Sequence, residues 1–184
     1  MRIVGGTHRG RPLTSLGKGD PAAHLRPTAD RVRESLFNML AGGYDDPVTG
    51  ARVLDLFAGT GALGLEALSR GAERVLFVES GRKALALIRS NVARLGVEDR
   101  IAIRKQDATR LGAAEAPFDL VFLDPPYGTG LGDRAMAAAL AGGWIAPGAL
   151  IVWEEAQPPV LPPALGALDR RRYGDTWITL ARRG

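Results

Sequence analysis

From residue 51 onward, short apolar runs alternate with stretches that carry apolar residues at helical spacing. Strands are expected at Val53–Phe57, Arg74–Val78, Arg100–Arg104, Phe118–Leu123 and Ala149–Trp153, with helices around residues 63–71, 85–95 and 133–141. Neighbouring parallel strands need a crossover connection between them, so this alternation of strands and helices predicts a parallel sheet with helices on both faces. The expected fold class is therefore α/β, with a doubly wound sheet.

The rhythm changes after residue 155. Residues 156–166 contain four prolines, which argue against a long helix in that segment. The runs Leu168–Tyr173 and Thr176–Arg182 lie on either side of Gly174-Asp175 and predict a terminal antiparallel hairpin.

The first forty-five residues differ from the rest. Arg2–Val4 and Arg11–Leu13 flank several glycines and predict a small β-hairpin. Thr28 is expected to cap a helix that Gly42-Gly43 ends; its apolar positions are Val32, Leu36, Met39 and Leu40. We therefore divide the chain into an extension of residues 1–45 and a main domain of residues 46–184.

The positive charge of the chain is concentrated in its first part. Residues 1–40 carry seven lysines or arginines against three acids, whereas residues 41–184 carry 17 of each sign. A basic arm on a neutral body predicts contact with a polyanion such as nucleic acid. The alternative is a solvated basic face that keeps the protein soluble.

Composition excludes several classes of protein. The 184 residues include no cysteine, which excludes disulfide scaffolds and cysteine-ligated metal sites. Two histidines, His8 and His24, do not make a convincing metal centre. No apolar run reaches the length of about 18 residues that a membrane helix needs, and the N-terminus lacks the apolar stretch of a signal peptide. We expect a cytoplasmic protein.

A glycine-rich turn follows the first strand of the main domain. Gly59, Gly61 and Gly64 form a G-x-G-x-x-G pattern, and Glu79 ends the next strand 20 residues after Gly59. Glycines allow close approach to a ligand, a helix N-terminus supplies free N–H groups, and an acid can accept from a ribose diol. The pattern predicts a nucleoside cofactor at the carboxyl edge of the sheet.

Two further aspartates bear on which cofactor this is. Asp55 lies inside the strand, where a carboxylate suits the amino group and sulfonium of S-adenosylmethionine better than a pyrophosphate. The alternative role for Asp55 is hydrogen-bonded support of the turn. Asp107 follows the third strand and, with Ala108, is placed to receive the adenine; a plain turn aspartate is equally compatible with its position.

The sequence Asp124-Pro125-Pro126-Tyr127 directly follows the fourth strand. The prolines fix the backbone and leave the Pro125 carbonyl as an acceptor beside the Asp124 carboxylate, so that together they can hold a flat –NH2 group. Tyr127 offers a ring on which a base can stack. This arrangement is suited to making the exocyclic amine of a nucleobase nucleophilic toward a nearby methyl sulfonium.

In combination, these motifs resemble the Rossmann-like, class I S-adenosylmethionine-dependent methyltransferases that modify amino nitrogens. The segments Arg2–Leu13, Arg26–Leu40 and Phe57–Arg70 closely resemble the bacterial 16S ribosomal RNA (guanine-N2)-methyltransferase family. The resemblance implies an enzyme that methylates a guanine N2 in 16S rRNA, as naked RNA or within a small-subunit assembly particle. We expect it to act as a monomer and without a membrane.

The resemblance also implies roles for particular residues. Cofactor contacts are implied for Asp55, Gly59, Gly61, Glu79, Asp107 and Ala108, catalysis for Asp124, Pro125, Pro126 and Tyr127, and RNA contacts for Arg9, Arg11, Arg26, Arg31 and Arg33. Arg31 or Arg33 could instead pair with Glu34 or with the body of the domain.

Three other functions remain open from the sequence. A DNA adenine-N6 or cytosine-N4 methyltransferase shares the turn chemistry, although the chain leaves no room for a separate target-recognition domain. A nicotinamide-dependent oxidoreductase would account for the glycine pattern, and a non-catalytic RNA-binding module would account for the basic arm.

Overall fold

The computed structural model describes residues 1–15 and 29–184 of the chain. Its helices are α1 (Asp30–Gly43), α2 (Ala62–Ser69), α3 (Arg82–Leu95) and α4 (Leu131–Ala141), with 3-10 turns η1 (Gly6–His8), η2 (Glu98–Arg100) and η3 (Ala108–Arg110). Its strands are β1 (Arg52–Leu56), β2 (Arg74–Glu79), β3 (Ile101–Lys105), β4 (Phe118–Leu123), β5 (Ile145–Glu155), β6 (Leu165–Tyr173) and β7 (Thr176–Arg183). Within these described residues, no helix is long and apolar enough to cross a membrane.

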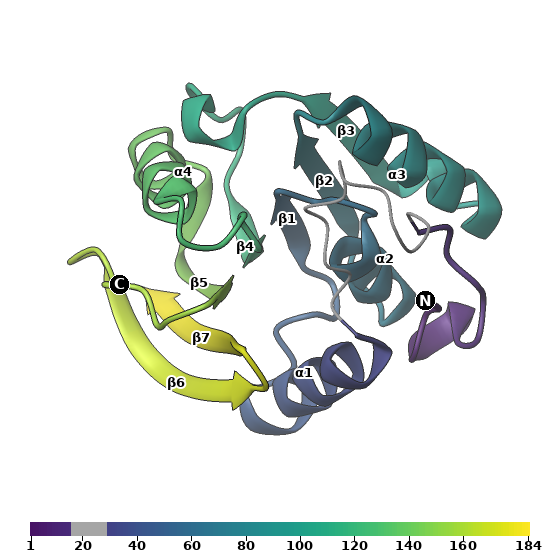
Figure 1. Ribbon diagram of the computed structural model, residues 1–184, viewed down its shortest axis with the longest axis horizontal. Helices are drawn as coiled ribbons and strands as arrows, with labels where there is room; N and C mark the ends of the chain where they lie inside the picture. The colour runs from purple at the N-terminus through teal and green to yellow at the C-terminus, as the bar shows by residue number, and fades with distance from the viewer. Residues whose placement is uncertain (16–28) are drawn as a thin grey trace.

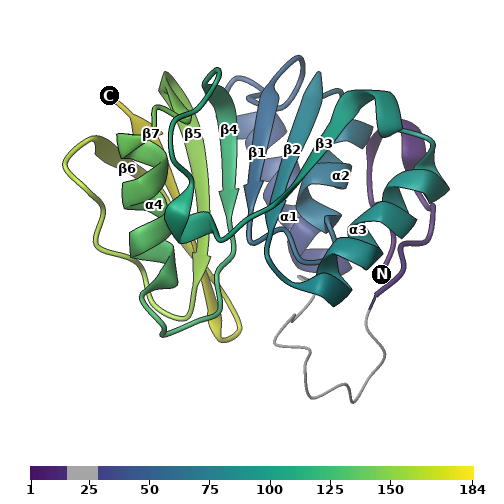
Figure 2. The same ribbon diagram turned by 90° about the horizontal axis from the view of Figure 1, so that it is seen from above.

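The strands form one sheet in the order β3-β2-β1-β4-β5-β7-β6 (Figures 1 and 2). Strands β1 to β5 pair in parallel, and β7 runs antiparallel to both β5 and β6. The chain builds outward from β1 in one direction to β3, then returns to β4 on the other side of β1. This reversal is the point at which open α/β sheets bind ligands, beyond the carboxyl ends of the strands.

Side-chain alternation along the strands creates two apolar layers. Val53 of β1 and Phe122 of β4 pack with apolar residues of α1, α2 and α3. Their neighbours Leu54 and Leu123 point to the other face, where they pack with residues of α4. The doubly wound α/β prediction is thus confirmed, with α1–α3 covering one face and α4 the other.

The N-terminal hairpin is shorter than the sequence predicted. Only Arg2 and Pro12 form an antiparallel bridge, and η1 occupies the connection between them. Hydrogen bonds from the Ile3 N–H to the Arg11 carbonyl and from the Leu13 N–H to the Met1 carbonyl flank this bridge. Gly6 and Gly10 have positive φ angles of 73° and 83°, which curl the chain beyond it. The expected cap at Thr28 lies outside the described residues.

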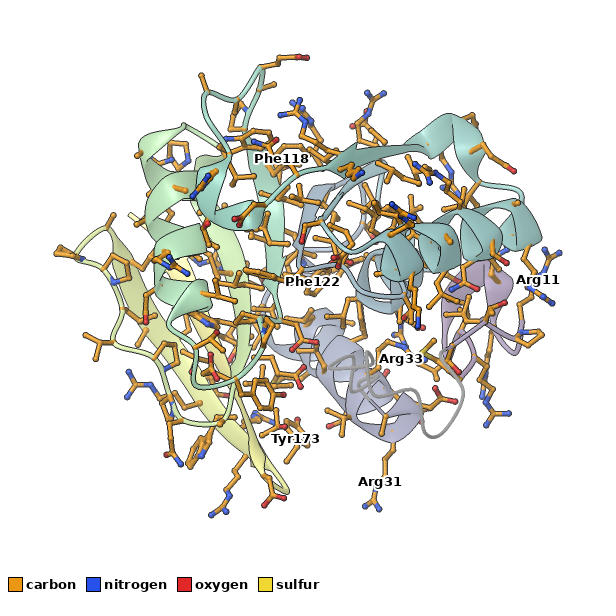
Figure 3. All side chains as sticks on the ribbon, turned by 45° about the horizontal axis from the view of Figure 1, so that its top comes forward. Arg11, Arg31, Arg33, Phe118, Phe122 and Tyr173 are labelled. Carbon is orange, nitrogen blue, oxygen red and sulfur yellow. The ribbon has the colours of Figure 1, made fainter. Side chains whose placement is uncertain are left out.

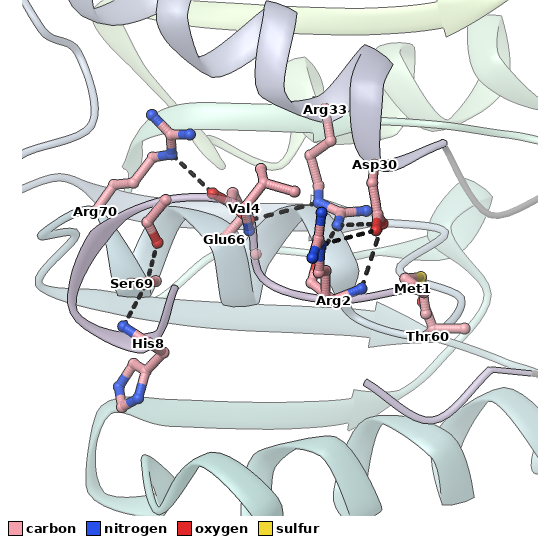
Figure 4. Close-up of polar contacts among 12 residues, drawn as sticks. Met1, Arg2, Val4, His8, Asp30, Arg33, Thr60, Glu66, Ser69 and Arg70 are labelled. Carbon is pink, nitrogen blue, oxygen red and sulfur yellow. Dashed lines mark hydrogen bonds and ion pairs between the residues drawn. The ribbon is translucent and has the colours of Figure 1, made fainter. Parts of the chain in front are cut away.

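A buried ion cluster fastens the N-terminal segment to α2 (Figure 4). The Glu66 side chain on α2 is fully buried and accepts a hydrogen bond of 2.9 Å from the Val4 N–H. Its carboxylate also pairs with Arg33 Nε at 3.5 Å and with Arg70 Nε at 2.8 Å. Arg33, equally buried, reaches Asp30 Oδ1 at 2.9 Å and donates to the Arg2 carbonyl.

A second polar link connects the arm to the glycine turn. The buried Asn91 side chain of α3 accepts from the Thr14 N–H at 2.6 Å. Its amide group donates to the carbonyl oxygens of Thr14 and Thr60, each at 3.0 Å. Because Thr60 lies between Gly59 and Gly61, the arm supports the turn on which the candidate site is built.

Candidate active site

Four aspartate or glutamate residues lie at the carboxyl edge of four neighbouring strands. Asp107 follows β3, Glu79 ends β2, Asp55 is the penultimate residue of β1, and Asp124 follows β4. The sheet order therefore places them in a row across the reversal point (Figure 1). Among the described residues, neither Asp55 nor Asp124 forms an ion pair with a lysine or arginine.

The glycine turn is held by the carboxylate of Glu79. Its Oε2 accepts from the Gly59 N–H at 2.9 Å, and its Oε1 accepts from the Gly81 N–H at 2.7 Å. Gly59 and Gly61 have positive φ angles of 58° and 78°, and Gly61 immediately precedes α2. Each carboxylate oxygen has a second lone pair, so the same group can still accept from a ligand.

Gly64, the third glycine of the pattern, serves packing. A Cβ atom at this position would lie 2.4 Å from Phe77 Cε1 of β2. The missing side chain lets α2 lie directly against the sheet, as the third glycine of such a pattern does.

Asp55 is buried, with 2% exposure, and its Oδ2 accepts from the Gly64 N–H at 3.0 Å. The turn-support role that the sequence left open is therefore present. Burial raises the pKa of Asp55 to about 7, with a further rise from Glu79, against the lowering effect of the Gly64 hydrogen bond. Asp55 is thus a carboxyl whose charge lacks compensation within the protein.

We expect this raised pKa to make the fold less stable as the pH rises. The folded protein binds the Asp55 proton more tightly than the unfolded chain, so its stabilising contribution is complete in acid and declines through the folded-state pKa near 7. Between about pH 5 and pH 7 the wild-type free energy of unfolding should fall by roughly 2 kcal/mol relative to Asp55→Asn. Urea unfolding of both proteins at several pH values in this range measures the difference. If the free energy of unfolding changed with pH equally in both proteins, the prediction would be wrong.

Asp107 is exposed and shapes the loop after β3. Its Oδ1 accepts from the Thr109 N–H at 2.9 Å and from Thr109 Oγ1 at 2.8 Å. These hydrogen bonds lower the pKa of Asp107 and keep it ionised. Ala108 begins η3 and is buried with 3% exposure, so its side chain packs in the core.

The turn after β4 is anchored by its tyrosine. The Tyr127 hydroxyl donates to Glu154 Oε1 at 2.6 Å and shares a hydrogen bond of 3.0 Å with Thr176 Oγ1. Burial and the Glu154 hydrogen bond raise the pKa of Tyr127, so the phenol stays protonated. Pro126 is exposed, and its carbonyl accepts from Thr129 Oγ1 at 2.6 Å, whereas the Pro125 carbonyl accepts no hydrogen bond from a described residue.

Asp124 begins this turn, and its N–H points toward the Leu56 carbonyl of β1 at 3.5 Å. Burial raises the pKa of its carboxyl well above the ordinary value, and the negative charges of Glu154, Asp55 and Glu155 raise it further. This part of the sheet edge therefore carries acids that repel one another and would be stabilised by a cation.

Sequence reasoning missed Glu154. This acid lies near the end of β5, is 8% exposed, and receives the tyrosine hydrogen bond that positions the turn. The available signal was the pair Glu154-Glu155 directly after the apolar run of the fifth strand, at the same sheet edge as the other acids.

A cavity of about 410 Å³ lies beside the turn. Its wall includes Gly128 and Gly130 of the loop, Asp133 of α4, and Trp153 and Glu155 of β5. The Trp153 indole N–H is buried and has no hydrogen-bond partner among the described residues. The cavity is therefore apolar in part, and its wall residue Gly128 directly follows the predicted catalytic residue Tyr127.

The predicted RNA-contacting arginines are not gathered at this edge. Arg31 is exposed on α1, one turn before Ser35 (Figure 3). The Ser35 hydroxyl shares a hydrogen bond with the hydroxyl of Tyr173, the last residue of β6. Arg33 is fully buried in the ion cluster, so its assignment to RNA is wrong. It pairs instead with Glu66 in the body of the domain, which is the alternative that the sequence left open. Arg26 lies outside the described residues.

Arg9 and Arg11 are exposed at the tip of the N-terminal hairpin, far from the catalytic turn. The tip docks on the last residue of α2, where Ser69 Oγ accepts from the His8 N–H at 2.9 Å. Arg11 Nη1 lies 3.5 Å from the Arg94 carbonyl near the end of α3. Because α2 and α3 run back from the carboxyl edge, their ends mark the opposite, amino edge of the sheet.

Comparisons with known proteins agree on the family. The family described as conserved hypothetical protein 95 matches residues 1–182. The ribosomal RNA small subunit methyltransferase D of Escherichia coli K12 is 38% identical over 94% of this chain and 84% of that protein. The protein of the same name from Haemophilus influenzae is 36% identical over 89% of this chain and 83% of its own length.

A solved structure supports the same relationship. The yhhF protein of Escherichia coli superposes with a TM-score of 0.83 at 36% identity, covering 100% of this chain and 97% of that one.

Proposed function

We propose that this chain, which belongs to the family described as conserved hypothetical protein 95, transfers a methyl group from S-adenosylmethionine to the N2 amine of a guanine in 16S rRNA. The observation that carries the proposal is the position of Asp124. Its carboxyl, with a raised pKa and no basic partner among the described residues, opens a rigid Asp-Pro-Pro-Tyr turn at the same sheet edge as the glycine turn.

The residues present fit this cofactor. Asp55, Glu79 and Asp107 supply carboxylates for its cationic and hydroxyl groups, and the backbone of Gly59 and Gly61 allows close approach. Ala108 directly follows Asp107 and stays assigned to the same contact. Uncompensated carboxyls at Asp55 and Asp124 favour a cationic ligand over a pyrophosphate, which would add negative charge. When bound, S-adenosylmethionine supplies a methyl group on a sulfonium sulfur, which an amine can attack.

The turn would hold the base. The Asp124 carboxylate and the Pro125 carbonyl are two acceptors for the hydrogens of a guanine –NH2, whose lone pair they turn away from the ring. A cationic ligand would lower the pKa of Asp124 and leave its carboxylate ionised as an acceptor for these hydrogens. After transfer the nitrogen must lose one proton, which Asp124 or water takes. The Tyr127 ring, fixed through Glu154 and Thr176, offers the base a stacking surface.

The proposal assigns RNA contact to the exposed arginines of the arm. Arg9 and Arg11 to alanine should weaken binding of 16S rRNA and reduce the slope of log affinity against log salt by about 0.7–0.9 for each lost phosphate contact. A filter-binding series over several salt concentrations measures this slope. An unchanged slope would mean that these arginines only solvate the arm.

The direct test uses labelled S-adenosylmethionine. We would offer the protein small ribosomal subunits lacking the modification, naked 16S rRNA and duplex DNA, and then identify the modified nucleoside. N2-methylguanosine from a ribosomal substrate is the expected product. Label in DNA alone would instead indicate the amino-methyltransferase alternative, and no label in any substrate would contradict the proposal.

The relatives favour none of the alternatives left open by the sequence, because they are named ribosomal RNA methyltransferases. Stabilisation by S-adenosylhomocysteine but not by NADH in a thermal-shift comparison would exclude the oxidoreductase directly. A ribosomal substrate implies action in the cytoplasm, and the proposed chemistry requires only one copy of the chain.

A further inference from the structure

A second cavity, of about 240 Å³, lies at the amino edge of the sheet, opposite the catalytic turn. Its wall includes residues at the beginnings of four parallel strands: Arg52 of β1, Arg74 of β2, Ile101 of β3 and Phe118 of β4. A strand of five or six residues spans roughly 17–20 Å, so the two cavities are separated by about that distance. No residue of the proposed catalytic or cofactor site lines this cavity.

Arginines dominate the polar wall of this cavity. Arg100 and Arg104 line it together with Arg52 and Arg74, against the two acids Asp99 and Glu115. Of these four arginines, only Arg74 forms an ion pair within the described part of the chain, from its Nε to Glu73 Oε1 at 3.4 Å. The guanidinium groups of Arg52, Arg100 and Arg104 form no ion pair or hydrogen bond with any described residue, although all three side chains are partly buried.

Two of these guanidinium groups lie over aromatic rings. Arg52 Cζ is 5.2 Å from the Phe118 ring centroid, and Arg104 Cζ is 5.0 Å from that of Trp144. Phe118 and Trp144 also stack on each other, with centroids 6.1 Å apart and an angle of 7°. The stack orients the cations, and because the rings already have partners they offer little surface to a base. The cavity therefore suits an anion.

The basic wall continues toward the tip of the N-terminal arm. Arg100 belongs to η2, which follows α3, and Arg11 reaches the Arg94 carbonyl near the end of that helix. The pKa of His8, a residue of the arm, is lowered by burial and by the positive charges of both Arg11 and Arg100. Cations from the arm and from the sheet thus lie along one edge of the molecule.

We infer that this amino edge, from Arg9 and Arg11 through Arg100 to the cavity at Arg52 and Arg104, binds the phosphate backbone of the RNA substrate at a distance from the methylated base. The inference rests on the proposed function for the identity of the RNA, but its evidence is independent of the catalytic turn. It explains why the arm points away from that turn. Partly buried guanidinium groups that form no ion pair lose hydration, and phosphate oxygens restore their hydrogen bonds.

The test compares Arg100→Gln and Arg104→Gln with Arg89→Gln, which removes the same charge from an exposed position on α3. Binding of naked 16S rRNA is measured over a salt series, with S-adenosylhomocysteine binding as the check on folding. Each of the first two variants should weaken binding and reduce the log–log salt slope by about 0.7–0.9, whereas Arg89→Gln should leave it unchanged. Equal slopes for all proteins would overturn the inference.

Two further measurements identify the ligand. A target-containing dinucleotide, too short to span the roughly 17–20 Å between the two edges of the sheet, should bind all variants equally; discrimination against Arg104→Gln by this RNA would contradict the placement. Saturable binding of inorganic phosphate that Arg104→Gln removes, with rRNA binding intact, would assign the cavity to a small anion and overturn the inference. A defect with assembled subunits but not with naked rRNA would indicate a protein partner and overturn it too.

Methyl transfer is assayed separately on the same variants. A wild-type protein that binds rRNA with the expected dependence on Arg100 and Arg104, yet methylates no guanine, would overturn the proposed function and leave the binding edge standing. Normal methylation, together with rRNA binding that does not depend on Arg100 or Arg104, would overturn the binding edge and leave the proposed function standing.

Discussion

Asp124→Ala is expected to abolish methyl transfer, with a loss of at least about 10²–10⁴-fold in turnover, while S-adenosylhomocysteine binding survives. The carboxyl follows β4 beside the rigid proline pair, and burial raises its pKa, with further rises from the negative charges of Glu154, Asp55 and Glu155. Removing it deletes one of the two acceptors for the guanine amine and leaves the glycine turn, which Glu79 holds, unchanged. Single-turnover methylation of 16S rRNA and a cofactor titration measure the two properties.

Two companion variants sharpen the interpretation. Asp175→Ala removes an exposed acid from the β6–β7 turn near the same edge and should retain activity. Asp124→Asn keeps one acceptor oxygen and should retain more activity than the alanine variant. Near-normal turnover of Asp124→Ala would defeat the proposed mechanism, because no other residue of the turn supplies a carboxylate.

Arg33→Ala should destabilise the fold by about 3–5 kcal/mol. Its guanidinium is completely buried between Glu66 and Asp30, and it also donates to the Arg2 carbonyl. Removal leaves Glu66, itself fully buried, with Arg70 as its remaining ion-pair partner and leaves a void between α1 and α2. Urea unfolding monitored by circular dichroism gives the change in the free energy of unfolding.

The matched control is Arg31→Ala, two residues earlier on the same helix. Arg31 is exposed, so this variant should change the free energy of unfolding by no more than about 0.5 kcal/mol. If Arg33→Ala were as mild as Arg31→Ala, the ion cluster would contribute little and the attachment of the arm would need another explanation.

Much of the sheet could be predicted because its strands are continuous apolar runs. Phe118–Leu123 was predicted with the bounds that β4 has. Strand β2 extends one residue beyond the prediction at its end, and β1 and β3 are each shifted by one residue at both ends. The start of β5 was missed by four residues. Pro147 and Gly148 indicate a break, and the pairing with β4 does shift between Phe118 and Leu120, but the strand resumes after the irregularity.

The candidate site was predictable where topology alone fixes position. Residues that follow parallel strands meet at one edge, which brings Asp55, Glu79 and Asp124 together without knowledge of any side-chain contact. Ion-pair partners were not predictable in the same way. Helical spacing places Arg33 on the face of Leu36 and Leu40 and Arg31 on another face, which is consistent with the burial of Arg33 alone. The pairing of Arg33 with Glu66, however, depends on how α1 packs against α2.

The direction in which the arm points was also not predictable, because the number of charged residues does not show where they lie in the fold. The sequence places Arg9 and Arg11 on a hairpin, but the docking of His8 on Ser69 decides that the tip lies at the amino edge. Glu154 escaped prediction for a related reason, since its importance depends on a hydrogen bond from Tyr127, 27 residues earlier in the chain.

The attachment of the arm has a consequence for the order in which the molecule forms during translation. The Val4 N–H binds Glu66, and the Thr14 N–H binds Asn91, partners that lie 62 and 77 residues later in the chain. The arm therefore has no place to dock until α2 and α3 have been synthesised and folded. A nascent chain that stops before Asn91 carries the basic residues of the arm but cannot fix them, so the arm acquires its ordered position only after the chain has grown past α3.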